Sequence, residues 1–321
     1  MNVLAKKDKI KKSGSSEITV LIAYIGLCII FSILSPNFLS LRNFINIGIY
    51  SAITGITATA ITLVLICGGI DISVGSIMGL TGMLCAILMK NGVPVIPTIL
   101  IALATSAVAG AINGVVVSLG KIVPMIATLA SMSIFRGIAY LMNNGTSVVI
   151  SNKSFVWLGR GYIGPVPFIL IVMVLFYVVM HYVANYTAYG RRMYATGANK
   201  RAGYLAGINT TKITFSIYLL SGIFAGVSGI LMAAQAGGGI PTAGNGYEMT
   251  IISACVLGGT SINGGKGSIW GTFLGVVLLT TINNGLTMLS VNSFWQEIIK
   301  GSILLAAVLL DAWRNGSYKK V

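Results

Sequence analysis

Acidic residues are scarce in this chain, and histidine is nearly absent. Only six of the 321 residues are acidic, and the single histidine is His181, near the end of an apolar segment. One histidine cannot anchor a His-rich metal site, and the sequence offers no nucleophile with a matching base. We therefore expect no catalytic residue, no metal site and no enzyme chemistry in this chain.

Paired cysteines are missing as well. The four cysteines lie singly inside apolar segments, and none belongs to a C-x-x-C motif; they are Cys28, Cys67, Cys85 and Cys255. This spacing implies neither a disulfide framework nor a zinc site.

Charge of either sign is sparse, because only 8% of the residues are charged while 55% are hydrophobic. A soluble domain of this size cannot bury that much apolar surface, so the bilayer must act as its solvent. We expect an all-α polytopic membrane protein of about ten transmembrane helices, with one domain at 18–312 between a basic tail (1–17) and a second tail (313–321). The ten apolar segments are 18–35, 44–67, 73–89, 94–118, 122–142, 166–186, 213–235, 248–258, 268–290 and 294–312.

The basic residues give a net charge of +15, but they sit in short gaps between apolar segments rather than on one face, which excludes a nucleic-acid partner. If the N-terminus lies inside, 15 of the 21 basic residues fall on the inner side and 4 on the outer side. Cytoplasmic loops retain Lys and Arg, so we expect a cell-membrane protein, in an inner or plasma membrane, with both termini cytoplasmic. The first apolar run is predicted to be a membrane helix, with a cleaved signal as the alternative.

One glycine cluster, GGTSINGGKGS (258–268), has the look of a phosphate-binding loop. A P-loop requires Ser or Thr after its lysine, whereas Lys266 is followed by Gly267, and its leading glycine is replaced by Thr260. We therefore exclude nucleotide binding at this loop. Most of the 40 glycines are expected to let membrane helices pack closely, as on the face formed by Gly222, Gly226 and Gly229.

A second stretch, GGIDISVGSIMG (68–79), resembles GGTSINGGKGSIWG (258–271). Both begin Gly-Gly and end G-S-I-x-G, and weak internal symmetry is typical of duplicated transporter halves. We expect an internal repeat of two halves, either parallel or inverted, and the segment 248–267 either spans the membrane or re-enters it. Broken helices at such glycines often line a pathway. The candidates at these two breaks are Gly68, Gly69, Ser73, Gly258, Gly259 and Thr260.

The longest inner loop, 187–211, contains signals for a short helix. Asn199 is a good N-cap and Gly207 a natural C-terminal stop. Ala202, Leu205 and Ile208 form an apolar stripe with basic neighbours. Such a helix docks onto a partner protein or lies on the membrane surface, and the residues alone leave both possibilities open.

Motifs along nearly the whole chain carry a resemblance to a known family. They are LSPNFLSLRNFINI (34–47), LVLICGGIDISVGSIMGLTG (63–82), IATLASMSIFRGIAYLMNNG (126–145), ATGANKRAGYLAGINTTKI (195–213), PTAGNGYEMTIISACVLGGTSINGGKGSIWGTFLG (241–275) and NNGLTMLSV (283–291). On these residues the chain resembles the ribose-type permeases of monosaccharide ABC importers. It departs from their pattern at Glu248-Met249-Thr250, where Glu-Leu-Asp is usual, and at Gly203, where a second alanine is common.

The resemblance implies a homodimer in the lipid bilayer, an extracytoplasmic sugar-binding protein and a cytoplasmic double-domain ATPase that holds ATP and Mg, with no cofactor in this chain. The expected cargo is a monosaccharide, ribose or a related pentose. The alternatives are a self-sufficient secondary transporter or channel, or an ABC permease for another sugar, a polyol or a furanose signal molecule. The resemblance to ribose-type permeases also implies an ATPase-coupling helix. Its residues are Gly197, Asn199, Arg201, Ala202, Leu205, Gly207 and Ile208.

Ionisable residues inside membrane segments are candidates for function. Glu297 and Lys300, spaced i, i+3, are predicted to pair. Asp71 is predicted to cap the next helix, with a pathway ligand as the alternative. Glu248 suits the start of a helix, or else it contacts the binding protein at the outer mouth, and Arg136 is expected to snorkel.

Membrane amides are expected to bond neighbouring helices, with contact to a sugar as the alternative. The amide candidates are Asn113, Asn283 and Asn284.

Overall fold

The computed structural model of this chain describes the backbone of residues 3–314. Most of the tail predicted at 313–321 therefore lies outside the described residues, as do the first two residues of the basic tail.

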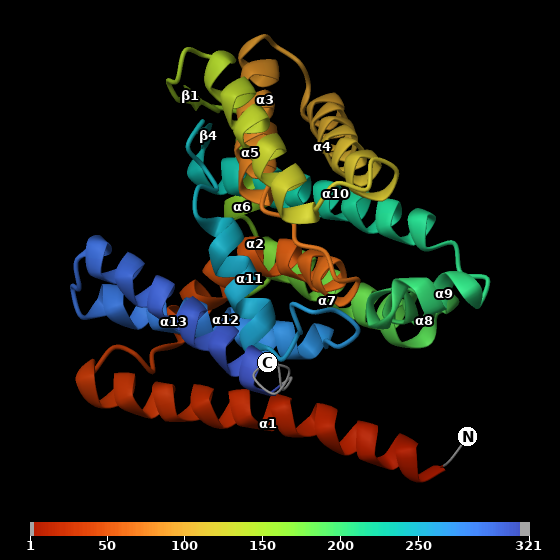
Figure 1. Cartoon of the computed structure of the whole chain (residues 1–321). Coiled ribbons are helices and arrows are strands. Elements are labelled where there is room, and N and C mark those ends of the chain that lie inside the picture. The colour runs from red at the N-terminus through yellow and green to blue at the C-terminus, as the bar shows by residue number, and fades with distance from the viewer. Residues whose placement is uncertain (1–2, 315–321) are drawn as a thin grey trace.

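The described part of the chain forms thirteen α-helices (Figure 1). They are α1 (Val3–Leu34), α2 (Leu41–Ile66), α3 (Val74–Lys90), α4 (Val95–Ser118), α5 (Pro124–Leu141), α6 (Lys153–Arg160), α7 (Phe168–Tyr186), α8 (Ala188–Ala198), α9 (Lys200–Leu205), α10 (Thr210–Ala236), α11 (Tyr247–Leu257), α12 (Ile269–Met288) and α13 (Ser293–Arg314). Two short antiparallel ladders join β1 (Val148–Val149) to β4 (Gly238–Gly239) and β2 (Tyr162–Ile163) to β3 (Val166–Pro167).

Each of the ten predicted apolar segments coincides with one helix, and among the described residues seven helices are long and apolar enough to cross a membrane. The prediction of an all-α polytopic membrane protein is confirmed. One boundary differs, because α1 begins at Val3 and so includes most of the predicted basic tail. That tail contains no proline and is rich in lysine, a good helix former, so the helix continues through it.

Two helices form the centre of the bundle. In the most apolar stretch of each helix, 89% of the residues are buried in α2 and 72% in α10, whereas only 11% are buried in α1. A helix that is apolar on all sides must be surrounded by protein or lipid, and these two are surrounded by protein. Figure 1 shows α3, α4 and α5 on one side of this centre and α1, α12 and α13 on the other.

The predicted small-residue face on α10 is confirmed. A side-chain carbon added at Gly222 would lie 2.5 Å from the carbonyl oxygen of Ser106 on α4, and one at Gly229 would lie 2.5 Å from that of Met78 on α3. Since no hydrophobic force draws helices together in lipid, close backbone packing of this kind supplies the contact.

Helix α11 is too short to cross a bilayer. Its 11 residues span about 16 Å, roughly half of a 30 Å hydrocarbon core. The segment 237–246, which contains no helix, connects the end of α10 to the start of α11. Non-helical backbone is tolerated at membrane depth only where protein buries it or where it lines a cavity.

Candidate functional site

The two glycine loops identified in the sequence lie against each other. The N–H of Gly265 donates a hydrogen bond of 2.7 Å to the carbonyl of Ile66, at the end of α2. A side-chain carbon added at Gly264 would lie 3.0 Å from the Cα atom of Gly68. The loop after α2 and the loop after α11 therefore meet backbone to backbone, and a side chain at Gly264 would also come within 2.8 Å of the carbonyl oxygen of Gly197.

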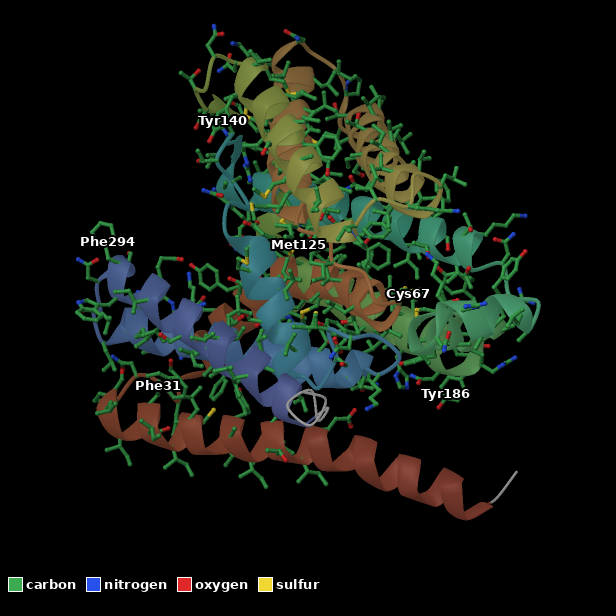
Figure 2. All side chains as sticks on the ribbon, viewed as in Figure 1. Phe31, Cys67, Met125, Tyr140, Tyr186 and Phe294 are labelled. Atoms are coloured by element: carbon green, nitrogen blue, oxygen red, sulfur yellow. The ribbon has the colours of Figure 1, made fainter. Side chains whose placement is uncertain are left out.

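Helix α8 rests on this contact. The Tyr194 hydroxyl donates to the carbonyl of Gly267 at 2.9 Å, and burial raises the pKa of Tyr194. A side chain at Gly197 would overlap the carbonyl oxygen of Ile66, and one at Gly265 would lie 2.9 Å from the Cα atom of Ala198. We call residues 66–69, 194–198 and 258–268 the glycine junction. Figure 2 places Cys67 and Tyr186 at this end of the bundle and Phe294 at the other.

The two loops share one local structure. In each, three successive N–H groups donate to carbonyls four, three and five residues back, the pattern of a Schellman helix end. The donors are Cys67, Gly68 and Gly69 in one loop and Gly258, Gly259 and Thr260 in the other. The left-handed residue is Gly68 (φ +78°) in the first and Gly259 (φ +90°) in the second. The structural equivalence is therefore shifted by one residue from the sequence match of Gly68 with Gly258.

Helix α9 forms where the sequence predicted it. The side chain of its N-cap, Asn199, accepts a hydrogen bond of 2.9 Å from the N–H of Ala202, and Gly207 follows with φ +79°. The side chain of Leu205 is 78% exposed, so α9 presents an apolar residue to its surroundings. Ile208 packs against the core instead, and the predicted stripe is therefore divided between an outward and an inward face.

A buried polar network gathers three of the candidate residues. The Asp71 carboxylate accepts hydrogen bonds from the N–H of Ser73 at 2.9 Å, from its hydroxyl at 2.6 Å and from the Ser221 hydroxyl at 2.6 Å. The Asn113 amide donates to the Ser73 hydroxyl at 2.8 Å. Asn113 thus bonds a neighbouring segment, as predicted.

This network corrects the role predicted for Asp71. The N-cap of α3 is Ser73, not Asp71, because the carboxylate turns to the two serines. Sequence reasoning also missed Ser221, which is separated from Asp71 by 150 residues. We call Asp71, Ser73, Asn113 and Ser221 the Asp71 network.

Glu248 and Arg136 meet at the segment before α11. Glu248 occupies the first turn of α11, as predicted, and its carboxylate accepts from the N–H of Gly246 at 3.2 Å. The prediction that Arg136 snorkels is wrong. Its guanidinium donates to the carbonyls of Pro241 at 2.6 Å and Ala243 at 2.7 Å, because these turn carbonyls offer acceptors inside the bundle.

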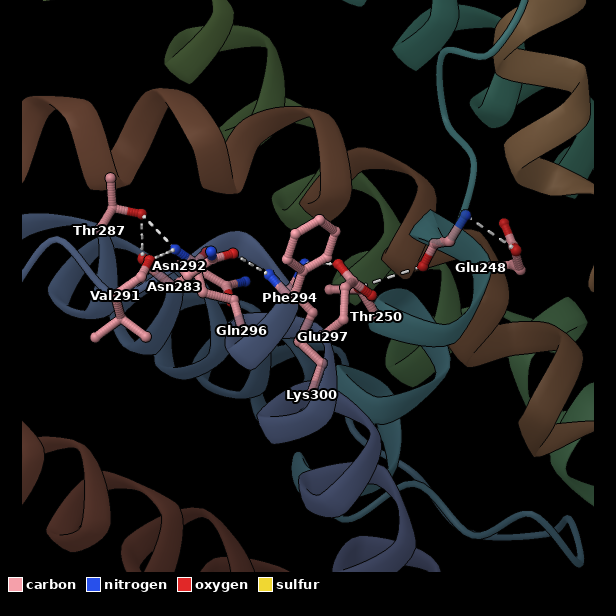
Figure 3. A network of polar contacts seen from close by, with 11 residues as sticks. Glu248, Thr250, Asn283, Thr287, Val291, Asn292, Phe294, Gln296, Glu297 and Lys300 are labelled. Carbon is pink, nitrogen blue, oxygen red and sulfur yellow. Dashed lines mark hydrogen bonds and ion pairs between the residues drawn. The ribbon is translucent and has the colours of Figure 1, made fainter.

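The remaining polar candidates lie on α12 and α13. The side-chain oxygens of Asn283 and Asn284 are buried and have no hydrogen-bond donor within the described part of the chain. The predicted pair is confirmed, since the Lys300 ammonium lies 2.7 Å from the Glu297 carboxylate. Figure 3 shows this pair on α13 beside Thr250 of α11, with Glu248 farther away. These residues do not join the Asp71 network.

Comparison with known proteins gives matches over most of the chain. A family model described as branched-chain amino acid transport system / permease component matches residues 43–308. The chain is 42% identical over 287 residues to the ribose import permease protein RbsC of Bacillus subtilis (strain 168), covering 89% of each protein. It is 40% identical over 304 residues to RbsC of Escherichia coli (strain K12), covering 94% of this chain and 95% of that protein.

A further relative is the xylose transport system permease protein XylH of Escherichia coli (strain K12), which is 32% identical and matches 94% of this chain and 93% of its own length. No solved structure matches the chain.

Proposed function

This chain belongs to the family of membrane transport-system permease components, and from that premise we propose that it is the membrane subunit of an ATP-binding-cassette importer. It is a multi-pass membrane protein and a transport subunit. The proposed cargo is a monosaccharide, ribose or a related pentose, because identity to the two ribose permeases is 40% or more over at least 89% of the chain, against 32% for the xylose permease.

The proposed assembly has three kinds of protein component. Two copies of this chain form the membrane part in lipid, and an extracytoplasmic binding protein delivers the sugar. A cytoplasmic ATPase with two nucleotide domains binds and hydrolyses ATP with Mg, so this chain carries no cofactor. The permease-component family and its named relatives support this arrangement.

The proposed coupling role rests on one observation: α9 directly follows α8, and α8 contacts both glycine loops of the glycine junction. Leu205 is exposed, while α8, which precedes α9, is held to both glycine loops through Tyr194 and Gly197. A partner that moves α9 therefore moves α8, and α8 contacts the ends of α2 and α11 at once. We propose that 187–211 is the coupling loop and that this contact transmits ATPase motion to the membrane helices.

Leu205→Asp is expected to lower ATP-driven sugar uptake by about tenfold or more in proteoliposomes holding the complete transporter. A charge on an exposed apolar contact residue disrupts docking, and the central residues of an interface contribute most of its binding energy. Because Leu205 is exposed, the permease itself should fold normally, as gel filtration would show.

Leu205→Met is the matched control, since it keeps an apolar side chain of similar size, and it should retain most of the uptake. Normal uptake by Leu205→Asp would contradict the coupling role. Uptake by the permease alone, driven by an ion gradient without the ATPase, would instead show a self-sufficient secondary transporter.

The proposed orientation places α9 in the cytoplasm and the loop before β1 outside. In intact cells that express the permease without its ATPase, a membrane-impermeant maleimide should label Ser147→Cys at least about tenfold faster than Arg201→Cys, because both positions are exposed on the permease but a charged reagent crosses the bilayer slowly. Permeabilising the cells should make the two rates similar. The opposite order of labelling would contradict cytoplasmic placement of the coupling loop and of both termini.

A further inference from the structure

A cavity of about 280 Å³ lies apart from the glycine junction and the Asp71 network. It is lined by α3, α10 and the segment leading to α11, and its polar side chains are Thr242, Asn245 and Tyr247. Met78 and Met232 contribute apolar walls. No charged side chain lines it, so its chemistry suits a neutral ligand.

The segment beside the cavity is held in place from several sides. Arg136 on α5 binds the carbonyls of Pro241 and Ala243, and Glu248 accepts from the N–H of Gly246. A side chain at Gly75, in the first turn of α3, would overlap the carbonyl oxygen of Gly244. A preorganised backbone lowers the entropy cost of ligand binding at its side chains.

Thr242 and Asn245 project from this fixed backbone with exposed side chains. Their backbones bond each other, the N–H of Asn245 donating to the carbonyl of Thr242 at 3.2 Å. Neither side chain has a hydrogen-bond partner in the part of the chain that the structure describes. The free hydroxyl group of Thr242 and the free amide group of Asn245 therefore face the cavity, while the backbone carbonyls of residues 240–244 beside them already accept hydrogen bonds.

The position of the segment also fits a transport site. Figure 1 shows the connection from β4 to α11 running between the group of α3, α4 and α5 and the group of α11, α12 and α13. Since α11 covers only about half a bilayer, the end of this connection that joins α11 lies inside the membrane. In secondary transporters, discontinuous helices at membrane depth form the substrate sites. The physical reason extends to other transporters, because non-helical backbone at this depth is tolerated where it lines a cavity.

We propose that this cavity binds the transported sugar, a neutral polyhydroxylated molecule of one ring, on its way through the membrane. Thr242 and Asn245 hydrogen-bond its hydroxyl groups, and Tyr247, Met78 and Met232 contact its C–H face. The volume lies just below the roughly 300–1,000 Å³ of drug-sized ligand sites, which suits a single sugar ring. The inference rests on the proposed transport function and adds where the cargo binds.

The test measures uptake of radiolabelled ribose by the complete transporter in proteoliposomes. Thr242→Val and Asn245→Ala are each expected to lower uptake about fivefold, the loss that one hydrogen bond typically represents, and the double variant is expected to lower it further. The matched control is Thr105→Val on α4, whose hydroxyl bonds only the carbonyl of Ile101 in its own helix at 2.9 Å, and it should transport normally.

A labelling experiment separates sugar contact from altered folding. In Asn245→Cys, a small neutral thiol reagent should react several times more slowly at residue 245 with ribose-loaded binding protein than with the empty binding protein, as mass spectrometry of that peptide would show. Ser147→Cys on the outer loop should react equally in both cases.

Normal uptake by both variants, or equal labelling of residue 245 with loaded and empty binding protein, would overturn this site while leaving the importer function standing. Absence of ATP-driven uptake by the unmodified chain would instead overturn the importer function.

Discussion

Gly197→Ala is expected to abolish ATP-driven uptake, with a loss of at least about tenfold, although the change adds only one methyl group. The new side chain would overlap the carbonyl oxygen of Ile66, a backbone atom that also accepts the hydrogen bond from Gly265. Neither the new methyl group nor the backbone carbonyl of Ile66 can rotate away, so α8 must move away from the glycine junction. Overpacking of this kind costs about 1–3 kcal/mol, which suffices to change the resting position of α8.

The loss is expected in coupling rather than in membrane insertion. Tyr194 and Gly197 are the points at which α8 holds the loops after α11 and α2, respectively. If α8 lifts, movement of α9 no longer reaches both loops together. ATP hydrolysis by the assembled transporter should therefore continue while sugar uptake fails, and the ratio of sugar transported to ATP hydrolysed is the quantity to measure.

Gly203→Ala is the matched control, because it makes the same exchange six residues later in the same loop. A side-chain carbon at Gly203 would find its nearest neighbour at 3.5 Å, the Thr210 methyl group, which is ordinary van der Waals contact. Alanine also favours a helix over glycine by up to about 1 kcal/mol, so α9 should be slightly stabilised. Equal effects of the two exchanges would show that the glycine junction plays no part in coupling.

Long apolar segments and local end signals were predictable from the sequence. All ten apolar segments became helices, and Asn199 and Gly207 correctly bounded α9, because hydropathy and capping depend on residues within one or two turns. Helix α8 (Ala188–Ala198) was missed, although the sequence offered a start signal: the side chain of its N-cap, Thr187, accepts a hydrogen bond of 3.2 Å from the N–H of Gly190. The paired glycine loops were recognised as related, but the one-residue shift between them appears only in their hydrogen bonds.

Contacts between distant segments were not predictable. Arg136 binds carbonyls more than 100 residues away, and Asp71 binds a serine 150 residues away. No local pattern specifies such partners, so Arg136 was expected to reach toward the membrane surface and Asp71 to cap the next helix. The sequence marked Asp71, Ser73 and Asn113 as candidates by residue type alone, and tertiary packing decided that they form one network with Ser221.

The second large effect is expected from Asp71→Ala, which should destabilise the detergent-solubilised permease by about 3 kcal/mol or more. The carboxylate is fully buried and accepts three hydrogen bonds, two from Ser73 and one from Ser221. Its removal leaves buried donors without an acceptor, each costing about 1–3 kcal/mol. The midpoint of thermal unfolding should fall, and uptake should fall with it, because the network ties the break between α2 and α3 to α10.

Asp71→Asn and Ser221→Ala show which hydrogen bonds account for the loss of stability in Asp71→Ala. Asparagine keeps the side-chain volume and one oxygen acceptor, so Asp71→Asn should lower the unfolding midpoint less than Asp71→Ala. Ser221→Ala removes one donor and leaves the carboxylate bonded to Ser73, so it should also have the smaller effect.

The double variant Asp71→Ala/Ser221→Ala decides whether the network acts as a unit. Once the carboxylate is gone, the Ser221 hydroxyl is an unpaired buried donor, and its removal relieves part of the cost. The double variant should therefore be destabilised by less than the sum of the single variants, with a coupling of about 0.5–3 kcal/mol. Strict additivity would mean that the Asp71–Ser221 hydrogen bond contributes nothing to holding the α2–α3 break against α10.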